Sequence, residues 1–232
     1  GFTSGQYVLD FDNLAGDVVY YGGVSNITLR CDNSLAVGIR LNNISYVLVK
    51  NVQLHGLQKG IYITGTACFS NFFEEVTGYA ITAYTVHMDA FTGGGQYMFS
   101  GCTFTGSDGF VLSSTAATDS LTFFNCNFEQ CITDDIYIAG SVSGLTIQGC
   151  RSEGLNGANS FFIETAVGKV VSGVSISGCS WWTDFGNAYA VTLSGAGIVK
   201  GFSITGNYAG YIGFLAFVNL NGQGEGGIIA GN

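Results

Sequence analysis

The chain has 232 residues, of which 47% are hydrophobic and only 10% are charged, and it contains 36 glycines and no proline. Its net charge is −9 and its seven basic residues are scattered, so no basic stripe is present to follow a nucleic-acid backbone. No apolar run reaches the ~18 residues that span a bilayer, and we therefore expect neither a nucleic-acid partner nor membrane insertion.

A repeat of about 25 residues begins near Ser25 and continues along the chain. Nine short segments align on one central position, and successive copies of that position lie 20 to 29 residues apart. The segments in chain order are LRCDN (29–33), VKNVQ (49–53), EEVTG (74–78), SGCTF (100–104), FNCNF (124–128), QGCRS (148–152), SGCSW (177–181), TGNYA (205–209) and AGN (230–232). The central residues are Cys31, Asn51, Glu75, Gly101, Asn125, Gly149, Gly178, Gly206 and Gly231.

The cysteines follow this repeat. There are seven of them and they form no CxxC pair, which argues against a disulfide framework and a structural zinc site. We expect no cofactor and no metal. Four of them occupy the position after the central residue in successive repeats, which predicts an internal ladder of reduced thiols: Cys102, Cys126, Cys150 and Cys179.

A second set of segments lies half a repeat away and alternates apolar with polar residues, as in half-buried strands. These segments are GIRLN, GIYIT, GFVLS, DIYIA, AVTLS and FVNLN. Two short strands per repeat, each stacked on its copy about 4.8 Å away, predict an all-β fold: a right-handed, single-stranded parallel β-helix of eight to nine coils. Residues 1–232 are expected to form one domain, with a lateral loop within residues 66–95, which fit the columns least well.

The columns SGCTF, FNCNF, QGCRS, SGCSW and TGNYA resemble the pectate-lyase-like β-helix superfamily and, within it, the tailspike proteins of bacteriophages. The resemblance covers nearly the whole chain, from about Ser25 to Asn232. The tailspike branch is favoured because the sequence has neither clustered Asp calcium ligands with a nearby Arg nor a Gly-Gly-x-Gly-x-Asp calcium repeat.

The resemblance implies a homotrimer carried on a virion, as part of a phage tail, that acts outside the host cell on a bacterial surface polysaccharide, either capsule or O-antigen. It also implies that this chain is the receptor-binding body of a longer protein. Two alternatives stay open: a non-catalytic β-helix that serves as an adhesin or fibre shaft, and a secreted polysaccharide lyase.

The column alignment places two carboxylates of adjacent coils, Glu129 and Glu153, at one position, with Trp182 at that position in the following coil. We expect Glu153 to act as general acid and Asp184 as base at the ~6.5–9.5 Å separation of an inverting glycosidase, with Glu129 as the alternate partner. Trp181 and Trp182 are expected to form a sugar-binding platform, and the resemblance favours such a Glu, Asp and Trp group. Solvated surface charges and a trimer contact are the competing interpretations.

Further substrate-binding candidates are Arg151, Asp134, Asp135 and Tyr137, although Asp134 and Asp135 also suit an ordinary turn. Tyr62 and Tyr137 share a strand column and suit an elongated carbohydrate groove or a stabilising ladder of tyrosines. His87, with Asp89 and Tyr84, suggests the proton-abstracting base of a lyase, but the sequence shows no Arg or Lys nearby to neutralise a uronate. A structural histidine is therefore the favoured interpretation.

Overall fold

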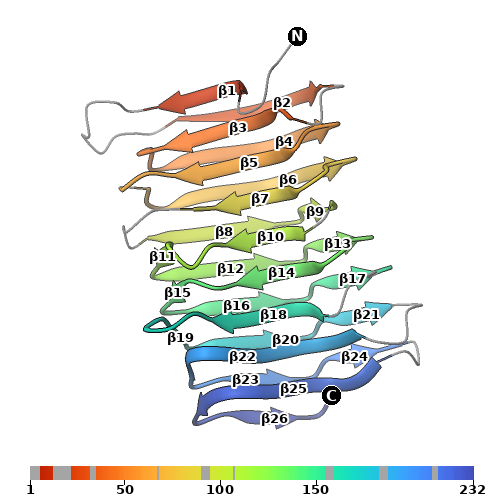
Figure 1. The fold of residues 1–232 in the computed structure, drawn as a ribbon. Coiled ribbons are helices and arrows are strands. Elements are labelled where there is room, and N and C mark those ends of the chain that lie inside the picture. The colour runs from red at the N-terminus through yellow and green to blue at the C-terminus, as the bar shows by residue number, and fades with distance from the viewer. Residues whose placement is uncertain are drawn as a thin grey trace.

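The computed structural model describes residues 6–12, 22–31, 35–66, 68–89, 95–106, 108–154, 159–182, 188–210 and 214–232. The described strands are stacked in parallel and run across a long axis (Figure 1). The described part of the chain has no helix that is long and apolar enough to cross a membrane. The predicted all-β parallel β-helix is confirmed.

Two sheets form the walls. The first stacks β1 (Tyr7–Asp12), β3 (Val37–Asn42), β5 (Lys59–Thr64), β7 (Tyr84–Met88), β10 (Asp108–Leu112), β14 (Asp134–Ile138), β18 (Asn159–Thr165), β22 (Ala188–Lys200) and β25 (Phe214–Glu225). The solenoid has about 7 turns, close to the expected eight to nine coils. The short strands β11 (Ala117–Thr118), β15 (Ser141–Val142) and β19 (Val170–Ser172) join this sheet through β22.

The second sheet stacks β2 (Gly22–Arg30), β4 (Val47–His55), β6 (Asn71–Tyr79), β8 (Gln96–Ser100), β12 (Ser120–Phe124), β16 (Leu145–Gln148), β20 (Val174–Ser177), β23 (Ser203–Thr205) and β26 (Ile228–Ala230). Its second row contains β9 (Thr103–Phe104), β13 (Asn127–Glu129), β17 (Arg151–Glu153), β21 (Ser180–Trp182) and β24 (Tyr208–Ala209). The long strand β6 pairs with both rows, so residues 71–79 of the segment expected to be irregular are ordinary strand.

A column of residues with left-handed backbone sets the bend between the two rows of the second sheet. Its members have φ between 50° and 64° and are Asn26, Asn51, Glu75, Gly101, Asn125, Gly149, Gly178, Gly206 and Gly231. Glycine and asparagine suit this conformation because glycine lacks the clashing Cβ and asparagine tolerates it best among other residues. The sequence alignment was wrong in the first coil: Asn26, not Cys31, belongs to this column, since Ser25 pairs with Lys50 and Ile27 with Val52.

The interior is filled by inward-facing columns of equivalent residues. Leu41, Ile63 and Leu112 are fully buried and belong to the predicted apolar column of the first sheet. Phe99 stacks between Phe73 and Phe123 at ring-centroid distances of 4.6 and 5.2 Å. Each such side chain contributes about 1.5–3 kcal/mol through removal of apolar surface from water, so the stack of coils is held mainly by these columns.

The predicted cysteine ladder is confirmed as interior. Cys102, Cys126, Cys150 and Cys179 are buried and unbridged. The Cys126 thiol donates to the carbonyl of Phe99 at 3.3 Å, and burial raises its pKa, so it stays protonated.

Candidate functional site

The predicted carboxylate patch lies where the alignment placed it. Glu129 pairs in register with Glu153 across β13 and β17, and Glu153 pairs with Trp182 across β17 and β21. The Glu153 carboxylate is ion-paired with Arg151 of its own strand, and Asn127 donates a hydrogen bond to Glu129. Both carboxylates are therefore already paired with neighbouring side chains of the same chain, as is usual for surface charges.

Trp181 does not belong to this patch, and its assignment to a sugar-binding platform is wrong. It is 1% exposed, and its indole N–H donates to Ser160 Oγ at 2.9 Å inside the coil. Successive residues of a strand face opposite sides, so Trp181 points inward and Trp182 outward. Trp182 is 42% exposed, and it is 6.0 Å from the Arg151 guanidinium and 5.9 Å from the Tyr208 ring.

Asp184, the predicted base, lies outside the described residues. The described part of the patch thus contains two partnered carboxylates and one exposed indole, and these three side chains line none of the five cavities described among the placed residues.

A groove of about 800 Å³ lies instead on the outer face of the first sheet. We call it the acidic groove. Its lining includes three carboxylates and three ring side chains together with Ser113: Asp108, Asp134, Glu164, Tyr84, His87 and Tyr137. It crosses β7, β10, β14 and β18 and therefore extends over neighbouring coils along the long axis.

The parallel register explains why these residues meet. Tyr84, Asp108 and Asp134 are equivalent residues of successive strands. The next outward column along the strands contains Tyr62, His87, Val111, Tyr137 and Phe162. Adjacent coils are about 4.8 Å apart, so the groove has one acidic column beside one largely aromatic column. The sequence prediction that Tyr62 and Tyr137 share a column is confirmed.

The acidic column is electrostatically unlike the predicted patch. Asp134 is 6% exposed, and burial together with the nearby charge of Asp108 raises its pKa to about 7, despite a hydrogen bond from Asn159. Burial also raises the pKa of Asp108, whose Oδ1 accepts the backbone N–H of Asp134 at 3.2 Å. No ion pair between described residues involves either aspartate. Near pH 7 the groove therefore holds a carboxyl that is ready to donate a proton.

Glu164 and Tyr137 close one side of the groove. The Tyr137 hydroxyl donates to Glu164 Oε2 at 2.8 Å, and burial and this contact raise the tyrosine pKa. The register neighbour of Tyr137 in β18 is Phe162, and Glu164 lies two residues further along that strand. Glu164 and His87 therefore belong to different columns, and both line the groove.

The prediction that Asp135 binds substrate is also wrong. It was expected to touch substrate, but it is fully buried inside the coil, where Ser152 and Ser160 donate hydrogen bonds to its Oδ2. Its Oδ1 is buried without a partner among the described residues, and burial raises its pKa to about 6. Asp135 is therefore an interior carboxyl and makes no contact with the groove.

His87 is 9% exposed and its Nε2 lies 2.9 Å from Ser113 Oγ at the groove wall. Burial and the charge of Lys59 lower its pKa to about 4, so the ring is neutral at pH 7. Lys59 pairs in register with Tyr84 and lies 4.2 Å from the Tyr62 ring centre. The sequence statement that no basic residue is near His87 is therefore wrong, because Lys59 comes from the preceding coil.

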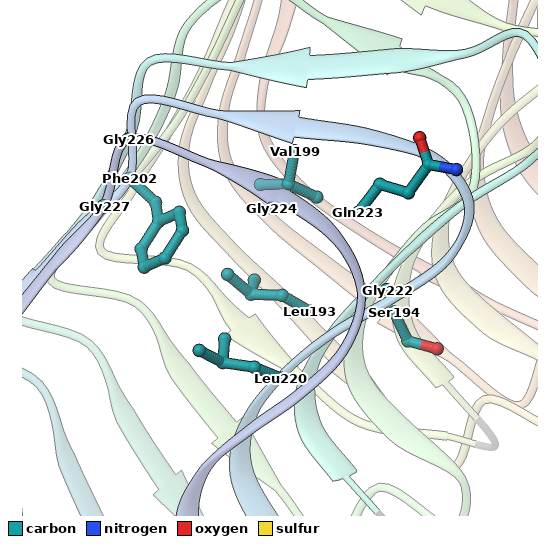
Figure 2. Close-up of a pocket in the computed structure, with 10 residues that line it drawn as sticks. All are labelled: Leu193, Ser194, Val199, Phe202, Leu220, Gly222, Gln223, Gly224, Gly226 and Gly227. Atoms are coloured by element: carbon teal, nitrogen blue, oxygen red, sulfur yellow. The ribbon is translucent and has the colours of Figure 1, made fainter.

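A smaller cavity of about 190 Å³ lies in the last coils. Figure 2 shows Leu193, Phe202 and Leu220 converging on it, beside the glycine-rich segment 222–227 at the end of β25. Its lining has no titratable side chain. Leu193 is buried, whereas its register partner Leu220 is 56% exposed, so the cavity lies at the surface of the last described strands and not inside the core. It offers no acid or base for chemistry.

The acidic groove was missed because it combines side chains of three columns with the turns that flank them, and a repeat alignment shows each column separately. The sequence feature that could have revealed the groove is the spacing of Tyr84, Asp108 and Asp134, which lie 24 and 26 residues apart and are equivalent residues of successive coils. No protein-family model and no curated protein matches the chain.

Proposed function

We propose that this chain is a carbohydrate-binding body that holds a bacterial surface polysaccharide along the acidic groove and hydrolyses it. The observation that carries the proposal is the pairing of Asp134, whose pKa is about 7, with Asp108 in a groove lined by tyrosine rings. A sugar ring binds through stacking on aromatic faces and hydrogen bonds to polar groups, and glycoside cleavage needs two carboxyl groups with different protonation states.

In this proposal Asp134 is the general acid that protonates the leaving glycosidic oxygen, and Asp108 is its charged partner. Their strands are adjacent and in register, so the two carboxyl groups belong to neighbouring coils, and the proposal assigns them the ~5–5.5 Å separation of retaining enzymes. Asp108 would then act as nucleophile, and Glu164 and Tyr137 would hold hydroxyl groups of the sugar. This assignment replaces the inverting pair of Glu153 and Asp184.

The tailspike assignment supplies the setting of the proposal: a virion-borne homotrimer that acts at the host surface. It rests on the resemblance of the repeat columns and on the β-helix fold. Light scattering at micromolar protein is its direct check, and a particle of 24.3 kDa would contradict the trimer.

The activity is tested by incubating the protein with capsule and O-antigen preparations and measuring new reducing ends. Hydrolysis releases them, an adhesin or fibre shaft binds without releasing any, and a lyase produces unsaturated uronates that absorb in the ultraviolet. The position of Lys59 beside Tyr84 and His87 is the observation that keeps the lyase as second candidate, since a cation there would neutralise a uronate carboxylate. For a hydrolase, proton NMR of the first product should show retained anomeric configuration.

A further inference from the structure

The wall of the acidic groove contains a second group of reactive side chains that glycoside hydrolysis does not use. Ser113 follows β10 at the point where the chain turns, and its backbone N–H donates to the carbonyl of Met88 at 3.0 Å. This bond fixes Ser113 on the end of β7, next to His87. The serine is half-buried and lines the groove, so its hydroxyl is accessible from the space proposed for the polysaccharide.

The Ser113 hydroxyl lies beside two proton acceptors. His87 Nε2 is 2.9 Å from its Oγ, and Asp89 is near enough for the serine to help lower the pKa of that carboxyl, so the single hydroxyl proton serves one acceptor at a time. Asp89 is in turn held by the Thr115 hydroxyl at 2.9 Å and by the Tyr62 hydroxyl at 3.4 Å. His87 Nδ1 is buried without a hydrogen-bond partner among the described residues, so the proposal assigns its proton to Nδ1 by chemistry: in that tautomer Nε2 accepts the serine proton, which is the arrangement of a nucleophile and its base.

The groups that face His87 keep this acceptor available. The Tyr62 and Tyr84 rings pack against the imidazole at centroid distances of 5.4 and 4.8 Å, and Lys59 and Asp89 are the charged neighbours. Burial and Lys59 lower the pKa of His87 to about 4, so the ring stays neutral across the neutral pH range. Burial raises the pKa of Asp89, but hydrogen bonds from Thr115 and the positive form of His87 outweigh it and the pKa is lowered.

We infer that Ser113 and His87 form an esterase site that removes O-acyl groups from the polysaccharide in the acidic groove. The carbohydrate part of this inference rests on the proposed function, whereas the acyl-transfer chemistry rests on the serine and histidine alone. Polysaccharide hydroxyls carry substituents along the chain, and Ser113 shares the groove with Asp134 and Glu164. An acyl group on a bound sugar would therefore lie within the same space.

The reaction balances without a co-reactant other than water. Ser113 Oγ bonds to the acyl carbon while its proton moves to His87 Nε2, and the carbon–oxygen bond to the sugar breaks as that proton passes to the leaving sugar oxygen. Water then attacks the acyl-serine, its proton returns through His87 to Ser113 Oγ, and a carboxylic acid is released. Asp89 and Thr115 orient the hydroxyl and take no part in bond exchange.

Esterase activity is measured with 4-nitrophenyl acetate and with acetate release from an O-acetylated polysaccharide. Ser113→Ala and His87→Gln should each lower the rate by about 10²-fold or more. Ser175→Ala, a half-buried serine on β20 of the other sheet, should retain the wild-type rate. Because the histidine is neutral above pH 5, the rate should show no inflection near pH 6.5, where an ordinary histidine base titrates.

A second measurement uses the unaltered protein. A fluorophosphonate reagent should modify Ser113, identified by mass spectrometry of peptides. Modification of no serine, or an unchanged ester rate in Ser113→Ala, would overturn the esterase site. The unaltered protein separates the two proposals: ester cleavage without new reducing ends contradicts only the proposed hydrolase, and new reducing ends without ester cleavage contradict only the esterase site.

Discussion

Two pairs of carboxylates lie on this β-helix with the same spacing and with different chemistry. Glu129 and Glu153 lie in adjacent coils on the second sheet, and Asp108 and Asp134 lie in adjacent coils on the first. The first pair has Asn127 and Arg151 as partners at the surface, whereas the second is recessed in a groove and ion-paired with no described residue. Stacking by itself therefore does not set the protonation state of a carboxylate pair. Burial and the nearby charge of Asp108 raise the pKa of Asp134 to about 7.

One substitution in each carboxylate pair tests this difference most directly. Asp134→Asn removes the proton donor, and loss of general acid catalysis lowers the rate by ~10²–10⁴-fold. Glu153→Gln should leave the rate close to wild type, because Glu153 is an ion-paired surface residue. Reducing ends released per minute measure both. The opposite ranking would restore the patch around Glu153 as the active site.

Substitutions of the two neighbouring tryptophans should have very different effects on the free energy of unfolding. Trp181→Ala empties an interior site packed against Phe161 at 5.2 Å, which typically lowers the free energy of unfolding by about 3–5 kcal/mol. Trp182→Ala removes an exposed ring and should change it by under about 0.5 kcal/mol. Denaturant unfolding of both variants checks this, and equal losses would mean that Trp182 is covered in the assembled protein.

The pH dependence of the free energy of unfolding should distinguish the interior carboxyl of Asp135 from the carboxyls of the groove. The pKa of Asp135 is about 6 in the folded chain and near 3.9 in an unfolded one, so the folded state holds the proton more tightly. The free energy of unfolding should therefore fall, by up to about 3 kcal/mol, as pH rises from about 4 to 6, and stay level above that. Asp135→Asn stays neutral and should flatten this fall. Urea unfolding at several pH values provides the measurement, with Asp134→Asn as the matched comparison, since its window extends to about pH 7. If the free energy of unfolding of Asp135→Asn fell with pH as steeply as that of the wild type, Asp135 would be excluded as the source of the pH dependence.

The smallest effect is expected at Arg151. Its ion pair with Glu153 joins side chains that are 52% and 33% exposed, and exposed pairs contribute about 0–1 kcal/mol. Arg151→Ala should therefore leave both the unfolding midpoint and the release of reducing ends nearly unchanged. A large loss of polysaccharide binding would instead place sugar on the second sheet.

The repeat columns made the fold predictable, because equivalent residues of a solenoid occupy equivalent places. The same columns could have placed Trp181 inside, since its register neighbours Phe128 and Ser152 are buried. The burial of Asp135 was harder to predict, because nothing in the sequence shows which of the two neighbouring aspartates faces outward and which faces the interior. The groove needed the structure, because its lining includes residues after the strands, such as Ser113 and Val167, which a strand alignment does not cover. Lys59, which lowers the pKa of His87, lies on the neighbouring strand of the preceding coil.

The column of left-handed residues has a consequence for how such a chain changes over evolutionary time. Between Asn125 and Gly231 its members are separated by 24, 29, 28 and 25 residues, yet each coil enters β13, β17, β21 or β24 in register with its neighbour. Extra residues are therefore absorbed elsewhere in the coil, and they leave the coils above and below unaltered. A lineage can lengthen or exchange a loop at the rim of the groove, and so alter which ligands fit there, without repacking the interior.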